Sequence, residues 1–209
     1  MYYFSIILAA VIGILRYNSS DRGLRILTIL FIVTVISELL CYISLINGHY
    51  EARYSLFHLY SILQGSLLSG YFLQVTKPYH HVKYIIAIVL FWPLTGVLNI
   101  MYLQPLDALN SNMLLTESLV FITLSLLFIY KSLKVDGLTI SSHFIIALIM
   151  LVFWSSTLLF WATIKILYRN HWKYTDQIMY AQAIVNIIAY LSIAVTIFYH
   201  TKKKKLESV

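Results

Sequence analysis

Residues 26–47 read ILTILFIVTVISELLCYISLIN, and Glu38 is the one charged side chain in this apolar run. As an α-helix the run would be roughly 33 Å long, which is enough to cross a hydrocarbon core of about 30 Å. Its apolar residues are continuous and do not alternate with polar ones, so a helix is favoured over a strand of a membrane barrel. The run therefore predicts a transmembrane helix.

The composition of the whole chain agrees with that prediction. Of its 209 residues, 60% are hydrophobic and 11% are charged, and the mean hydropathy is +0.81. Soluble globular proteins contain about 25% charged residues, and disordered chains combine low hydrophobicity with high charge. The composition excludes a disordered chain and an ordinary soluble enzyme, and it predicts an integral membrane protein.

Six further apolar runs are predicted to cross the membrane, although the first of them is short. The seven spans are residues 2–17, 26–47, 55–75, 84–103, 111–130, 143–166 and 177–200. We expect one all-α domain over residues 1–200, a seven-transmembrane-helix bundle, followed by a basic tail at 201–209. The first run has no positively charged segment before it and no small-residue cleavage pattern, so we expect a retained helix and not a signal peptide.

Lysine and arginine residues are unequally distributed between the two sides of the predicted bundle. With the N-terminus outside, the inner segments hold eleven of the 15 and the outer segments hold four. The inner residues are Arg16, Arg22, Arg25, Lys77, Lys83, Lys131, Lys134, Lys202, Lys203, Lys204 and Lys205, and the outer ones are Arg53, Lys165, Arg169 and Lys173. Because cytoplasmic loops carry the excess of Lys and Arg, we expect the N-terminus outside and the C-terminus inside.

The C-terminal run Lys202, Lys203, Lys204 and Lys205 holds much of the net charge of +7. A basic cluster directly after a membrane helix contacts anionic lipid head groups. We therefore expect membrane lipids, and not nucleic acid, as the partner of this tail.

Small residues recur at four-residue spacing in the third span, at Ser61, Gly65 and Ser69. Such a stripe lets neighbouring helix backbones approach closely. We expect this helix to lie in the centre of the bundle. A contact between two copies of the chain through the same face is the alternative interpretation.

Polar residues inside the spans are the candidates for a functional site, because such groups are costly in lipid and usually face a cavity or a partner. The candidates for ligand binding are Glu38, His58, Gln64, Asn99, Glu117, Gln182, Asn186 and Tyr190. All are predicted to lie in the middle or the outer half of the membrane, and the spacing of the last three places them on one helix face. They predict a polar pocket that opens to the outside. The alternative is that these groups only join helices by hydrogen bonds.

The sequence lacks the residues that several known membrane-protein and enzyme chemistries require. The last span has no lysine for a retinal Schiff base, and Gly-x-Ser-x-Gly and phosphate-binding glycine loops are absent. Cys41 is the only cysteine, which excludes a thiolate metal cluster. Glu38, His58 and Glu117 come from three helices without recognisable metal-ligand spacing. We expect no metal and no cofactor.

Five segments carry a resemblance to a known group of proteins. They are LRILTILFIVTVISELL at 24–40, LFHLYSILQGSLLSGYF at 56–72, ESLVFITLSLLFIYKSL at 117–133, FWSSTLLFWA at 153–162 and AIVNIIAYLSIAVTIFY at 183–199. In this order they resemble an uncharacterised group of seven-helix inner-membrane proteins common in Bacteroidota. In that group the third helix tends to carry an acid where this chain has Gln64. The resemblance implies the fold and a bacterial cytoplasmic membrane, and it implies no activity.

The expected function is that of a non-enzymatic sensory or accessory module. It would bind a small molecule or lipid in the outward-facing pocket and act through a protein partner in the membrane or at its inner face. One alternative is a lipid-modifying enzyme with Glu38 and Glu117 as an acid–base pair and His58 as the orienting residue. A second alternative is an oligomeric pore or membrane effector assembled through small-residue faces.

Overall fold

The computed structural model describes residues 1–76, 82–108, 110–134, 141–167 and 175–206, and these ranges contain seven α-helices and no strand. The helices are α1 (Tyr2–Arg16), α2 (Arg22–Ile46), α3 (Tyr50–Val75), α4 (Val82–Tyr102), α5 (Ser111–Leu133), α6 (Ser142–Leu167) and α7 (Thr175–Leu206). A single 3-10 turn, Tyr17–Ser19, follows α1. Each predicted span coincides with one helix, and the helices extend past most of the predicted ends.

Within the described ranges, five segments are long and apolar enough to cross a membrane. They are Tyr2–Ser19, Arg22–Ile46, Ser111–Leu133, Ser142–Ile164 and Gln177–His200. In α4 the apolar stretch Ile86–Tyr102 is shorter, and α3 is long but carries many polar residues. The prediction of an all-helical membrane protein is confirmed, and the number of seven spans stays a prediction.

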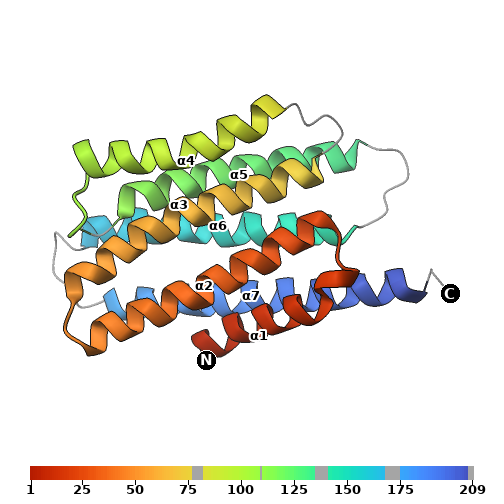
Figure 1. Ribbon diagram of the computed structural model, residues 1–209, viewed down its shortest axis with the longest axis horizontal. Coiled ribbons are helices and arrows are strands. Elements are labelled where there is room, and N and C mark those ends of the chain that lie inside the picture. The colour runs from red at the N-terminus through yellow and green to blue at the C-terminus, as the bar shows by residue number, and fades with distance from the viewer. Residues whose placement is uncertain (77–81, 109, 135–140, 168–174, 207–209) are drawn as a thin grey trace.

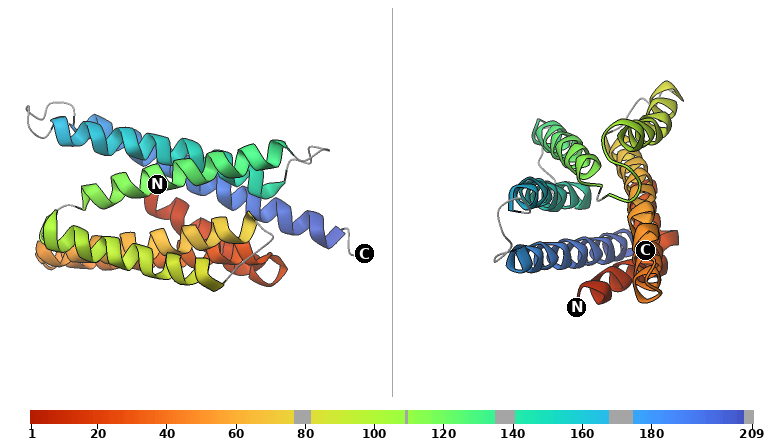
Figure 2. Two further views of the ribbon diagram at one scale, coloured as in Figure 1. Left: turned by 90° about the horizontal axis from the view of Figure 1, so that it is seen from above. Right: turned by 90° about the vertical axis from the view of Figure 1, so that its left-hand side faces the viewer.

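The helices form two layers, as the end view in Figure 2 shows. Helices α2, α3 and α4 form one layer, and α5, α6 and α7 form the other. α1 lies at one edge, where it contacts both α2 and α7, and α3 faces α5 near the opposite edge. α3 is the middle helix of its layer, which agrees with the central position expected from its small residues.

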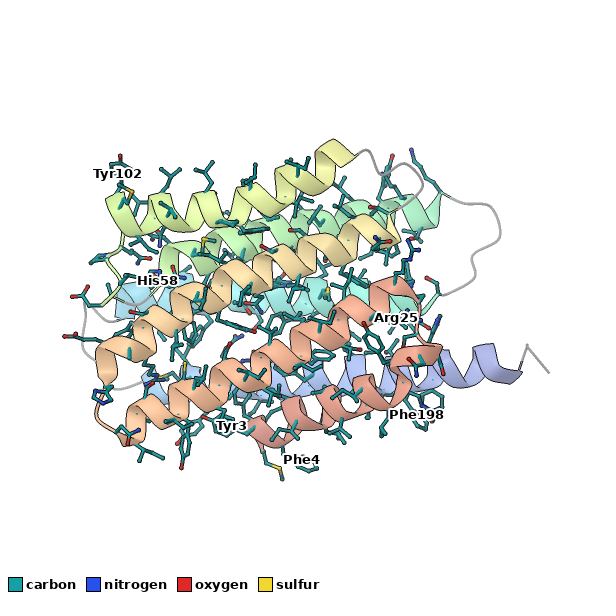
Figure 3. The ribbon with its side chains drawn as sticks, viewed as in Figure 1. Tyr3, Phe4, Arg25, His58, Tyr102 and Phe198 are labelled. Atoms are coloured by element: carbon teal, nitrogen blue, oxygen red, sulfur yellow. The ribbon has the colours of Figure 1, made fainter. Side chains whose placement is uncertain are left out.

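The end of α1, the end of α5 and the beginning of α2 lie at one end of the bundle (Figure 1), and these helix ends carry basic residues. The described members are Arg16, Arg22, Arg25, Lys131 and Lys134. We call this the basic end; Figure 3 labels Arg25 there, with His58 and Tyr102 toward the other end. The structure does not describe every basic residue of the prediction. Outside its described part lie Lys77, Arg169 and Lys173, and also the side chains of Lys83, Lys165, Lys202, Lys203, Lys204 and Lys205.

An aromatic cluster joins the two layers in the middle of the bundle. The ring of Phe121 on α5 stacks on Trp92 of α4 and on Phe72 of α3, with ring centroids 5.7 and 6.3 Å apart. The ring centroid of Trp154 on α6 lies 5.0 Å from that of Phe121. All four side chains are at most 2% exposed, so this cluster forms the centre of the hydrophobic core.

The small-residue stripe of α3 accommodates this cluster. A Cβ atom on Gly65 would lie 2.5 Å from the Trp92 ring, so only glycine allows the ring to pack there. Ser69 accepts a hydrogen bond of 2.8 Å from the Trp92 indole N–H, and Ser61 accepts one of 3.0 Å from Asn110. The stripe therefore contacts α4 and the connection to α5 within the same chain.

Candidate functional site

A cavity of about 550 Å³ lies between the two layers, toward the end opposite the basic end. We call it the main cavity. Its walls are mostly apolar, and all helices except α4 contribute to them. The lining residues are Tyr2, Glu38, Arg53, Phe57, Tyr60, Gln64, Leu114, Phe153, Trp154, Thr157, Phe160, Trp161, Ile164, Met179, Gln182, Ala183, Asn186 and Tyr190. Five of the eight predicted ligand-binding residues are among them: Glu38, Gln64, Gln182, Asn186 and Tyr190.

Glu38 lies on the wall between the main cavity and a second hollow. Its Oε1 accepts a hydrogen bond of 2.8 Å from the Tyr2 hydroxyl, which joins α2 to the beginning of α1. On its other side is an apolar groove of about 400 Å³ between α1 and α2, which Tyr3 and Leu39 also line. The carboxyl is therefore partly exposed and lies where two hollows meet.

A set of amide and hydroxyl groups forms the opposite wall, on α6 and α7. The Nε2 of Gln182 donates hydrogen bonds of 3.0 Å to Thr157 Oγ1 and to Asn186 Oδ1. Ser156 donates one of 3.1 Å to the Oε1 of Gln182. The amide of Gln182 is thus held in one orientation before any ligand arrives. Asn186 follows Gln182 after four residues, so both face the cavity, as the spacing predicts.

Aromatic rings form much of the remaining wall. Tyr190 lies with its ring centroid 6.3 Å from that of Tyr2 and 6.4 Å from that of Phe153. Phe57 and Tyr60 pair at 6.4 Å on α3, and Tyr60 also shares a hydrogen bond of 3.0 Å with Thr34. These contacts fix the rings that border the polar groups.

Two other predicted residues, His58 and Asn99, do not line the main cavity. His58 Nε2 lies 3.2 Å from the carbonyl oxygen of Ala108, and Asn99 donates a hydrogen bond of 3.0 Å to Asn110. Both side chains are at most 4% exposed. They join α3 and α4 to the connection that leads into α5, which corresponds to the alternative of hydrogen bonds between helices.

Glu117 is also outside the lining of the main cavity. Its side chain is 0% exposed, and neither carboxyl oxygen has a hydrogen-bond partner among the described residues. Buried polar groups almost always have a partner, so this carboxyl is an exception in the structure. The predicted pairing of Glu38 with Glu117 and His58 therefore has no shared cavity to support it.

A second polar cluster, at the basic end, joins four helices and was not predicted from the sequence. His143 Nε2 lies 3.0 Å from Asp21 Oδ2, and His200 Nε2 lies 3.4 Å from the same oxygen. The other ring nitrogens meet hydroxyl groups, with His143 Nδ1 3.3 Å from Tyr71 and His200 Nδ1 2.9 Å from Ser142. We call these residues the Asp21 cluster. Across the described ranges, no group of His, Cys, Asp or Glu is arranged to hold a metal ion.

Asp21 has a second role as the cap of α2. Its Oδ1 accepts a hydrogen bond of 3.0 Å from the Leu24 amide, in the usual N-cap arrangement. Burial raises the pKa of the Asp21 carboxyl, but hydrogen bonds from His143 and Leu24, together with the charges of His143 and His200, lower it to about 2. The native state therefore favours the charged carboxylate.

The lowered pKa predicts how stability depends on acid. Because the folded-state pKa of about 2 is below the unfolded value of about 3.9, Asp21 stabilises the fold fully above pH ~4 and loses this contribution as the pH falls toward 2. Melting temperatures of Asp21→Asn measured from pH 6 to 2 should decline less steeply than those of the natural chain. Asp107→Asn changes an exposed carboxyl and is the control. Parallel curves for all three proteins would contradict the assignment.

Comparison with protein-family models, curated proteins and solved structures finds no match to this chain.

Proposed function

We propose that this protein is a non-enzymatic membrane module that binds a small molecule or lipid in the main cavity and acts through a protein partner. The observation that carries the proposal is the cavity itself, with apolar walls and a few convergent polar groups from α2, α3 and α7. Ligand sites in proteins are typically concave and mostly apolar, with a small number of placed polar groups.

The distribution of basic residues supports an orientation for this module. Arg16, Arg22, Arg25, Lys131 and Lys134 share one end of the bundle, and cytoplasmic segments carry the excess of such residues. We infer a seven-span bundle with the N-terminus outside and the C-terminus inside, in the bacterial cytoplasmic membrane. The main cavity then lies toward the outer side, and the Asp21 cluster and the basic residues lie where a cytoplasmic partner or anionic lipids would meet the protein.

A binding function is favoured over a lipid-modifying enzyme because the two carboxyl groups of the candidate acid–base pair do not share a cavity. Glu38 borders the main cavity, whereas Glu117 is buried in the core with no hydrogen-bond partner in the described part of the chain. A general acid or base has to come within hydrogen-bond reach of the reacting group. A ligand in the main cavity would meet Glu38, Gln182 and Asn186, which are suited to recognition.

Two alanines on α7 allow a matched test of the proposed site. Ala183 lines the main cavity, whereas Ala181 is exposed on another face of the same helix. Ala183→Trp should fill the cavity and remove a bound molecule that native mass spectrometry detects on the natural protein, while Ala181→Trp should retain it. Circular dichroism and size-exclusion profiles confirm that both variants are folded. Equal retention by both variants, or a natural protein without any bound molecule, would refute the proposal.

A further inference from the structure

Two opposite charges border the main cavity and form no ion pair with each other or with another described residue, although Glu38 accepts a hydrogen bond from Tyr2. Glu38 comes from α2 and Arg53 from α3, and both line the cavity. The ion pairs of the described residues all involve Asp21. A half-buried carboxylate such as that of Glu38 is costly without a counter-charge, and a bound molecule with both charges would supply a counter-charge to Glu38 and to Arg53.

The two charges lie at different depths. Glu38 is eight residues before the end of α2, and Arg53 is three residues after the beginning of α3, which is the next helix of the same layer. At about 1.5 Å per residue, these positions differ by roughly 8 Å along the helix axis. Arg53 is exposed near the end of the bundle, whereas Glu38 is half-buried farther in. The cavity therefore has an outer positive group and an inner negative group.

Aromatic side chains make up much of the lining of the main cavity. Eight of the lining residues are aromatic: Tyr2, Phe57, Tyr60, Phe153, Trp154, Phe160, Trp161 and Tyr190. The faces of such rings attract organic cations, and cages of several rings bind alkylated ammonium groups. The rings and the Glu38 carboxylate thus favour the same type of group, an ammonium with an apolar body.

We propose that the ligand of the main cavity is a zwitterion, with its ammonium group beside Glu38 and the aromatic rings and its acidic group paired with Arg53. This inference rests on the proposed function. The order of the charges favours a soluble zwitterion of the amino acid or betaine type. A phospholipid whose chains point toward the bilayer centre would place its ammonium outermost, which is the reverse of the order of Arg53 and Glu38.

The test compares three probes that share one apolar body. Phenylalanine carries both charges, phenethylamine carries only the ammonium, and 3-phenylpropionate carries only the carboxylate. Affinity is measured by calorimetry with the protein in phosphatidylglycerol nanodiscs, which contain no zwitterionic lipid. Phenylalanine should bind at least about tenfold more tightly than either single-charge probe, because a hydrogen bond to a charged group contributes about 1.5–3 kcal/mol. Equal binding of phenylalanine and either single-charge probe would overturn the proposal.

Two conservative variants test which side chain binds which charged group of the ligand. Glu38→Gln should reduce the affinity for phenylalanine to that for 3-phenylpropionate, and Arg53→Gln should reduce it to that for phenethylamine. Glu51→Gln, which changes an exposed carboxyl near Arg53 on α3, should leave all three affinities unchanged. Unaltered selectivity in both Glu38→Gln and Arg53→Gln would also overturn the proposal.

A further measurement with a zwitterionic lipid distinguishes a soluble ligand from a phospholipid. Adding phosphatidylethanolamine to the nanodiscs should leave the melting temperature of the natural protein unchanged if the ligand is soluble. A rise that is lost in Glu38→Gln and Arg53→Gln would support the zwitterion and assign it to a lipid. If neither phenylalanine nor the lipid binds but Ala183→Trp still removes a bound molecule, the zwitterion is wrong and the proposed function stands.

Discussion

Trp92→Ala is expected to lower the free energy of unfolding by about 3–5 kcal/mol. The Trp92 side chain is 1% exposed, stacks on Phe121 and donates a hydrogen bond to Ser69. Its loss would leave a cavity between the two helix layers and an unpaired Ser69 hydroxyl. The measurement is reversible unfolding in mixed micelles with increasing dodecyl sulfate. Leu94→Ala, which truncates an exposed side chain of the same helix, is the control and should have a small effect.

A second substitution tests whether the contact with Gly65 is the reason. Gly65→Ala in the natural protein would push a methyl group into the Trp92 ring, and overpacking of this type costs about 1–3 kcal/mol. In the Trp92→Ala background the ring is absent, so the same change should cost close to nothing. If Gly65→Ala were equally destabilising in both backgrounds, the Trp92 ring would not be the group that the added methyl meets.

Glu117→Leu is expected to raise the free energy of unfolding by about 1–3 kcal/mol, which is the usual cost of a buried polar group without a partner. Both carboxyl oxygens of Glu117 are buried and unpartnered among the described residues, and leucine has a similar volume. Glu117→Gln, which leaves an equally buried amide, should give little of this gain. The same titration with dodecyl sulfate measures both variants.

The sign of the Glu117 result separates two explanations. Stabilisation by leucine would mean that the natural chain retains a costly carboxyl, which is typical of a group kept for function at the expense of stability. Destabilisation would mean that a buried water or ion accompanies the carboxyl in the membrane. In either case the comparison with Glu117→Gln distinguishes the effect of polarity from that of side-chain volume.

Much of the helical architecture could be predicted from apolar runs alone. The predicted span 55–75 ends where α3 ends, and the fifth span begins at Ser111, as α5 does. The face shared by Gln182 and Asn186 was also predictable, because a spacing of four residues fixes a direction within one helix. These features depend on residues that are close in the sequence.

The neighbours of each polar group could not be predicted in the same way. The sequence indicates the depth of His58 and Asn99 in the bundle, but their partners Ala108 and Asn110 depend on how the α4–α5 connection folds back. Asp21 contacts His143, which lies 122 residues away. No local spacing encodes such a contact, and the available signal was that both residues lie at helix ends on the same predicted side.

The Asp21 cluster can form only late in biosynthesis, because its residues are far apart in the chain. His200 lies 179 residues after Asp21, so at about 5–20 residues per second it is synthesised roughly 9–36 s later. During that interval α1 and the beginning of α2 lack the contacts that α7 provides in the finished bundle. The cluster can close only when the last helix arrives, so it marks the completion of assembly, and chains stalled before α7 would expose this unfinished end to membrane quality control.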